Sequence, residues 1–385
     1  MYTIDSFTGA DLPDKTLCIT FDDGPGEHTY EIAKFLYEEG IRATFFVVGK
    51  YAFQHPETLQ SLKDFNHLIA NHTYEHPDMP YYTSVNGDVQ DQINRTDVVI
   101  KRFINSDIIY FRSPYGKWSA EVASDLNSNL TACLGHLGPI YWDIGGIDCY
   151  YWQHDRSVDD AVAAYYKEIT EKKKGIVVFH DDIADMEYVK PKQKTLQLLQ
   201  SLIPRLKTEG YTFVGLEDIE SIKKAADKGL TFHLRTRNKK YISIRQSPGS
   251  GIYSISRKSK YAEFTLESCS HGKIALKSSK GFYLGVEKEE GNKVMADKSQ
   301  IETACLFDLI PVIHSQFMLR ASNGNYLVIN KEGSLVANAP YMRNSEIFSY
   351  CAINVTVKKN LPLGTHLLLL KKRFLYLKSK LLQAS

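Results

Sequence analysis

Two pairs of side chains in this sequence have the types and spacing of a metal site. His72 and His76 stand four positions apart, so on a helical turn both imidazoles would face the same way and share one ion. Asp22 and Asp23 end an apolar run, and neighbouring carboxylates on a strand point to opposite sides. One carboxylate can then bind an ion while the other faces a substrate. Two histidines and one aspartate leave a position open for water, as a catalytic metal ion requires.

These side chains lie in a region where short strands alternate with amphipathic helices. We expect a strand over residues 16–21, a helix over residues 29–39 and a second strand over residues 43–48. This alternation predicts an α/β fold of parallel strands joined by helices. In barrels of that kind, polar residues at the carboxyl ends of strands meet at one mouth, where we expect the chemistry.

Composition sets the broad class of the protein. Its 385 residues are 43% hydrophobic and 24% charged, which is ordinary for a soluble globular chain, and the length favours two domains. A formal net charge of +2 gives no reason to expect a nucleic-acid partner.

The six cysteines form no CxxC pair, which favours core thiols. No signal peptide is visible, so we expect a cytoplasmic protein or export without a standard signal.

Beyond about residue 228 the pattern changes to short strands with an internal repeat. Three sets of landmark residues recur at intervals of 41 to 43 positions: Phe232, Ile274 and Phe317; Tyr241, Tyr283 and Tyr326; Phe264, Phe307 and Phe348. Three units of this length predict a threefold all-β module. The repeated tyrosines could stack on sugar rings, but their recurrence favours a place in the core.

The last segment, residues 358–385, has a third character. Its apolar residues fall at spacings of three and four, its other positions are rich in Lys and Arg, and no acidic residue follows position 365. This pattern predicts a basic amphipathic helix. Packing on one of the domains is favoured over weak contact with an anionic membrane surface.

The motifs of the first part, taken in order, resemble the polysaccharide deacetylase family of the NodB-homology type, carbohydrate esterase family 4. The matching segments are residues 20–25 (TFDDGP), 72–77 (HTYEHP), 112–116 (RSPYG) and 210–214 (GYTFV). The resemblance implies a distorted (β/α) barrel over residues 1–225. It also implies an enzyme that hydrolyses N-acetyl groups on a polysaccharide or oligosaccharide and releases acetate.

The same resemblance assigns roles to single residues. The metal ligands would be Asp23, His72 and His76. Zinc is expected there, with cobalt, nickel or manganese as alternatives, because such a ligand set accepts several divalent ions. Asp22 would be the general base that takes a proton from the attacking water, and Arg112 would pair with it and keep it ionised. The backbone N–H of Tyr115 would help to hold the oxyanion.

A general acid is needed because an amine leaves poorly unless it is protonated. His180 ends the apolar run of residues 175–180, resembles the family's fifth motif and is the expected acid, with Val178 as a wall of the acetate pocket. The fourth motif departs from the family, which shows an aspartate followed directly by tryptophan, whereas Asp148 is followed by Cys149.

Asp148 is nevertheless expected to orient the acid and raise its pKa, with Asp143 as a weaker candidate for that role. The departure leaves open which side chain replaces the tryptophan wall of the substrate groove. The candidates are Tyr150, Tyr151 and Trp152.

Residues 229–357 resemble the β-trefoil of fascin-like domains, through residues 317–320 (FMLR) and 323–327 (NGNYL). Such trefoils bind sugars or bundle filaments, so a carbohydrate-binding module that holds the enzyme on its polymer is expected. Two alternatives stay open: hydrolysis of O-acetyl esters by the same attack, and a non-catalytic protein that binds carbohydrate or crosslinks filaments. The motifs fit chitin, chito-oligosaccharide, peptidoglycan and exopolysaccharide alike.

Overall fold

The computed structural model describes most of the chain. The described residues are 2–104, 106, 108–128, 135–228, 230–245, 251–269, 273–313, 316–342 and 347–352. Among them we find no helix with the length and apolar content that a bilayer crossing requires. The predicted amphipathic tail, residues 358–385, lies outside the described residues.

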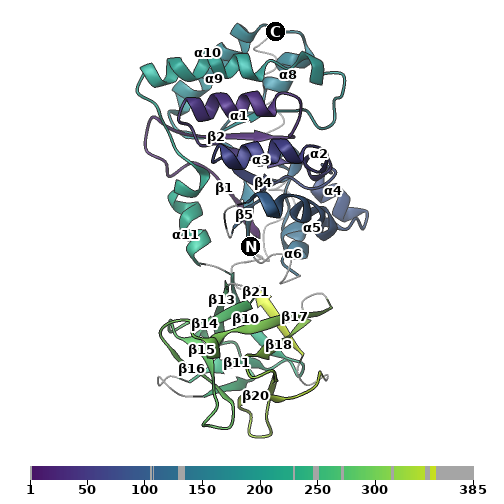
Figure 1. Cartoon of the computed structure of the whole chain (residues 1–385), viewed down its shortest axis with the longest axis vertical. Helices are drawn as coiled ribbons and strands as arrows, with labels where there is room; N and C mark the ends of the chain where they lie inside the picture. Colours follow the sequence, from purple (N-terminus) through teal and green to yellow (C-terminus); the bar gives the residue numbers. More distant parts are fainter. Residues whose placement is uncertain are drawn as a thin grey trace, which may run out of the picture. The chain divides into compact units, whose positions relative to one another are not determined.

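The first part of the chain contains two parallel sheets that follow one another around a distorted barrel (Figure 1). The larger sheet has β4 (Leu68–Asn71), β3 (Thr44–Val47), β2 (Thr16–Asp22), β8 (Gly175–His180) and β7 (Ile144–Gly145) in order, with β9 (Thr212–Phe213) beside β2. The smaller sheet has β1 (Tyr2–Phe7), β6 (His136–Ile140) and β5 (Ile109–Tyr110). A parallel bridge between Asn71 and Phe111 continues the order from β4 to β5. The predicted α/β class is confirmed.

Helices cover this sheet because its strands are apolar on both faces. All seven residues of β2 are buried, as parallel strands covered by helices require. The rings of Phe21 and Phe45 stack at 4.7 Å inside the core. The helices are α1 (Thr29–Glu38), α2 (Gly49–Gln54), α3 (Pro56–Asp64), α4 (Met79–Ser84), α5 (Val89–Ile100), α6 (Ala120–Leu126), α8 (Asp148–Gln153), α9 (Val158–Lys172), α10 (Thr195–Thr208) and α11 (Glu220–Lys228). The predicted strands and first helix are confirmed within two residues at each end.

The second part is a β-trefoil. Its strands are β10 (Leu230–Thr236), β11 (Tyr241–Ile244), β12 (Ile252–Ile255), β13 (Glu263–Ser268), β14 (Lys273–Ser278), β15 (Tyr283–Glu287), β16 (Lys293–Lys298), β17 (Phe307–Ile313), β18 (Gln316–Ala321), β19 (Tyr326–Ile329), β20 (Leu335–Ala339) and β21 (Phe348–Ala352). Six of them close a ring in the order β10, β13, β14, β17, β18, β21 and back to β10. The pairs β11–β12, β15–β16 and β19–β20 form three hairpins beside it.

The repeat landmarks occupy equivalent places in the three units. Phe264, Phe307 and Phe348 are at most 1% exposed and belong to one apolar cluster. Tyr283 and Tyr326 each begin the first strand of a hairpin and are 8% and 6% exposed. These two tyrosines therefore serve the core, as their recurrence predicts, and their buried rings are not available to stack on a sugar.

Candidate active site

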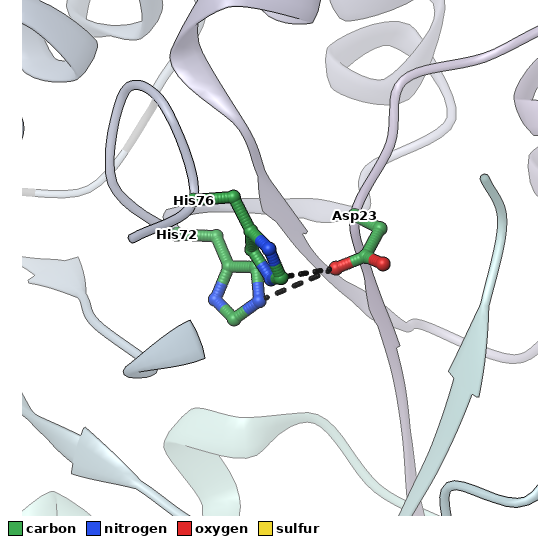
Figure 2. Close-up of side chains that lie close together, drawn as sticks. All are labelled: Asp23, His72 and His76. Atoms are coloured by element: carbon green, nitrogen blue, oxygen red, sulfur yellow. Dashed lines mark ion pairs between the residues drawn. The ribbon is translucent and has the colours of Figure 1, made fainter. Parts of the chain in front are cut away.

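The predicted metal ligands meet at the carboxyl ends of the parallel strands. Asp23 follows β2 and His72 follows β4, while His76 lies in the loop before α4. The Asp23 carboxylate oxygen Oδ1 is 3.1 Å from Nε2 of His76 and 3.6 Å from Nε2 of His72. Figure 2 shows both imidazoles turned towards this carboxylate, and all three side chains are buried. Their ligand atoms lie within 4.8 Å of one another.

The local backbone differs from the helical turn predicted for the two histidines. The segment from His72 to His76 is a loop in which Thr73 has φ +70° and His76 has φ +62°. The Thr73 hydroxyl accepts a hydrogen bond of 3.1 Å from the His76 amide and thereby holds the turn. Left-handed residues are uncommon for side chains of this size, and they cluster at functional sites. The imidazoles converge because of this turn, and the i,i+4 geometry of a helix plays no part.

A second left-handed residue overturns the expectation for the two aspartates. Asp23 has φ +79°, so the alternation of a strand stops at Asp22. Oδ2 of Asp22 lies 3.9 Å from Nε2 of His72, which Asp23 also approaches. The two carboxylates therefore face the same imidazole instead of opposite sides of the sheet.

The outer ring nitrogens of both histidines are occupied, which leaves the inner ones for an ion. Nδ1 of His72 forms a hydrogen bond of 2.8 Å with the backbone oxygen of Arg112. Nδ1 of His76 forms one of 2.6 Å with Oδ2 of Asp185. Partners of this kind orient the rings of metal-binding histidines. Burial lowers the pKa of His76, but the carboxylates of Asp23 and Asp185 outweigh it and raise the pKa to about 9. The same negative charges would attract a divalent cation, so the residues present fit the predicted metal.

Asp22 pairs with a cation from a distant part of the chain. Nη1 of Arg112 donates to Oδ1 of Asp22 at 2.6 Å and to the hydroxyl of Thr20 at 3.0 Å. The Arg112 side chain is fully buried, and its guanidinium lies 4.1 Å from the centre of the Phe46 ring. A buried cation without its partner would be costly, so this pair holds the Asp22 carboxylate in one place beside the ligands.

The expected acid and its partner form a second pair. His180 ends β8, and Asp148 is the first residue of α8. Asp148 accepts two hydrogen bonds of 2.7 Å from His180, one from Nδ1 and one from the backbone amide. Burial would lower the pKa of His180, but the charge of the buried Asp148 carboxylate raises it well above its usual value. Asp143, the weaker candidate, lies at the other end of β8, where it accepts from the amides of Gly9 and Ile176.

Comparison with known proteins identifies the family. A family model described as polysaccharide deacetylase matches residues 9–131, and a fascin domain model matches residues 231–350. A chitooligosaccharide deacetylase of Rhizobium leguminosarum bv. trifolii is 30% identical over 217 residues, which is 54% of this chain and 94% of the relative. The chain belongs to the polysaccharide deacetylase family.

Other proteins similar to this chain are named as peptidoglycan deacetylases. A peptidoglycan-N-acetylmuramic acid deacetylase of Bacillus subtilis is 24% identical over 217 residues, covering 56% of this chain and 75% of the relative. Among solved structures, a peptidoglycan N-acetylglucosamine deacetylase is 25% identical with a TM-score of 0.44, covering 57% and 92% of the two chains. The family matches confirm the predicted enzyme class and the fascin-like module.

The loop that carries Tyr115 packs against the predicted metal ligand His76. Tyr115 has φ +58°, and its ring centre lies 4.6 Å from that of His76. The following Gly116 also has positive φ, and a Cβ there would meet the rings of Tyr141 and Trp142 at 2.5 and 2.8 Å. The backbone of this loop is therefore held close to the ligands by aromatic neighbours.

Of the three candidates for the wall of the substrate groove, the structure excludes Trp152 and leaves Tyr150 and Tyr151, which are partly buried. Trp152 is 1% exposed and donates to the Thr195 hydroxyl, so it belongs to the core. Trp142 is only partly buried, lies 5.7 Å from the guanidinium of Arg112 and stacks on Tyr141. The position of Trp142 just before the fourth motif was the sequence signal that could have pointed to it.

Asp185 is a residue of the site that the motifs do not reveal. It lies in the loop after β8, and its Oδ2 accepts from both Nδ1 of His76 and the hydroxyl of Tyr115. One carboxylate thus ties a predicted metal ligand to the loop predicted to hold the oxyanion. An acidic side chain five residues beyond His180 was the only sequence signal, because no local pattern predicts what such a loop residue touches.

Replacing Asp185 by alanine is expected to weaken zinc binding by about 10- to 100-fold, the usual effect of removing the partner of a metal-binding histidine. Asp185→Asn keeps an oxygen acceptor for His76 and should restore part of the affinity. Competition with a chromophoric chelator measures this without any substrate. Glu187→Gln, a neighbouring exposed acid, is the control. Equal zinc affinity in Asp185→Ala and the control would show that Asp185 does not orient His76.

Proposed function

We propose that this protein hydrolyses N-acetyl groups of a polysaccharide or oligosaccharide in a reaction that depends on a divalent metal, releasing acetate and leaving a free amine. The observation that carries the proposal is the meeting of Asp23, His72 and His76 with the paired Asp22 at one end of the sheet. Relatives named as chitooligosaccharide and peptidoglycan deacetylases support N-acetyl sugars as the substrate class.

The ligands and the base have separate tasks in this proposal. Asp23, His72 and His76 would hold the ion, which as a Lewis acid would polarise the acetyl carbonyl and acidify water. Asp22 accepts a proton from the attacking water, and its pairing with Arg112 keeps its second oxygen turned towards that water. Attack on the carbonyl carbon places negative charge on the carbonyl oxygen, towards which the backbone N–H of Tyr115 would point.

His180 completes the reaction. Collapse of the tetrahedral state breaks the carbon–nitrogen bond, and the departing amine takes the proton that the imidazole donates. Asp148 positions the imidazole through Nδ1, which leaves Nε2 to face the substrate. Acetate then leaves, and the proton accepted by Asp22 balances the one that His180 has given.

We propose that residues 1–225 form the catalytic domain and residues 229–357 a module that holds the polymer. A hollow of about 480 Å³ in the trefoil supports this role. Arg235, Arg237 and Lys239 line it, and Nε of Arg235 has no hydrogen-bond partner among the described residues. A hollow with this lining suits acidic groups on a glycan.

In the full chain, Arg235→Ala with Arg237→Ala should weaken binding to insoluble polymer, whereas Lys331→Ala, outside the hollow, should not.

Metal-dependent release of acetate from N-acetylglucosamine oligomers tests the catalytic proposal. Removal of metal with a chelator is expected to abolish release, and one equivalent of zinc is expected to restore it. An acetylated xylan assayed beside the oligomers separates amide from ester substrates. Release that survives complete metal removal would contradict the proposed chemistry, and turnover of the ester alone would replace the amide by an O-acetyl substrate.

A further inference from the structure

A second group of potential metal ligands lies beside the first. Asp148, Cys149 and His180 each place one ligand atom within 4.8 Å of the others, and among the described residues only this group and the Asp23 group do so. Asp148 and Cys149 are the first two residues of α8, and His180 ends β8. The thiol therefore stands next to the pair expected to protonate the leaving amine.

The chemistry of this group differs from that of the first. A thiolate, an imidazole and a carboxylate form a ligand set typical of zinc, and the thiolate selects zinc or cobalt over manganese or magnesium. The thiol occupies the position where the family pattern has tryptophan, so the ligand set arises from the departure in the fourth motif. Burial raises the pKa of Cys149 although His180 opposes this, so the thiol is protonated until an ion displaces its proton.

The group is built to accept an ion with little rearrangement. Asp148 is fully buried, and its Oδ2 is held by the His180 amide. Oδ1 of Asp148 and Nδ1 of His180 are 2.7 Å apart, and ligands of a tetrahedral zinc ion stand about 3.4 Å apart, so this pair must open by less than about 1 Å. All three ligand atoms lie within 4.8 Å of one another. Cys149 as a residue is only partly buried.

We propose that a thiophilic divalent cation binds Asp148, Cys149 and His180 and inhibits the deacetylase by occupying its general-acid pair. The Cys149 thiol and the His180 ring each release a proton to solvent as the ion binds, while Asp148 is already a carboxylate. This inference rests on the proposed role of His180. Zinc should therefore activate at the first equivalent and inhibit at the second, and manganese should activate without this inhibition.

The full chain titrated with zinc and cobalt tests the site, with Cys149→Ser, Cys149→Ala and the control Cys269→Ser, whose thiol lies in the trefoil. The wild type and the control should bind two ions. Their second equivalent of cobalt should produce a thiolate-to-cobalt absorption band, and excess zinc should lower turnover by about 100-fold or more, the contribution of a general acid. Both Cys149 variants should bind one ion and lack the band. The turnover rate that each variant has with one equivalent of zinc should not fall when zinc is in excess.

Identical zinc inhibition in the wild type and the Cys149 variants, or a cobalt spectrum without a thiolate band, would overturn the proposal. A thiolate band at the first equivalent would overturn it too, because the ion would then prefer this group to the Asp23 group. The number of bound ions and the cobalt spectrum are measured without substrate, so they do not depend on enzymatic turnover. A second ion bound through Cys149 in a protein that releases no acetate would leave the site standing and reject the proposed function instead.

Discussion

Replacing Asp22 by asparagine is expected to lower N-deacetylation by about 10²- to 10⁴-fold while one equivalent of metal stays bound. Asparagine cannot accept the proton of the attacking water, but its oxygen can still accept from Nη1 of Arg112. The three ligands Asp23, His72 and His76 are untouched, so zinc affinity should change little. Steady-state kinetics and metal analysis of the same sample check both halves of the prediction.

Two comparisons separate loss of the base from loss of structure. Asp14→Asn, at an exposed acid before β2, should match the wild type in rate and metal content. His76→Ala should lose turnover and the ion of the Asp23 group, because it removes a ligand whose Nε2 lies 3.1 Å from Asp23. An Asp22→Asn protein that keeps full activity would show that another group accepts the proton.

Replacing Asp148 by asparagine is expected to move the alkaline limb of the pH profile of kcat/KM to lower pH. The acid must carry its proton, so the rate falls as the pH rises through the pKa of His180. Burial lowers that pKa and the Asp148 carboxylate raises it to a greater extent, so removing the charge lowers the pKa and the rate falls earlier. At pH 8 the loss should reach about 10²-fold or more, the range of a general acid, and it should shrink as the pH is lowered.

Asp143→Asn is the matched control for this profile. Asp143 also accepts hydrogen bonds from backbone amides, but at the far end of β8 from His180. Its replacement should lower the melting temperature without moving the alkaline limb. If Asp148→Asn leaves the limb in place, then Asp148 does not set the protonation of the acid, and its two hydrogen bonds to His180 serve structure alone.

The sequence by itself determined the fold classes and most of the site. The apolar run before Asp22 predicts a buried strand because burial on both faces of a parallel sheet demands continuous apolar residues. The 41- to 43-residue recurrence predicts the trefoil because each unit must bury its landmarks against the next. The motifs also single out both aspartates, both histidines and Arg112, because the type and order of these residues can be read directly from the linear sequence.

Tertiary structure alone decided how these residues meet. The left-handed conformations of Asp23 and His76 depend on the packing of loops around them, and they replace the strand alternation and helical turn that local pattern predicts. Asp185 reaches His76 across 109 positions, and Cys149 reaches His180 because α8 begins beside the end of β8. Contacts of this range depend on the order of strands in the sheet, which no short segment encodes, so only the folded chain shows the second ligand group.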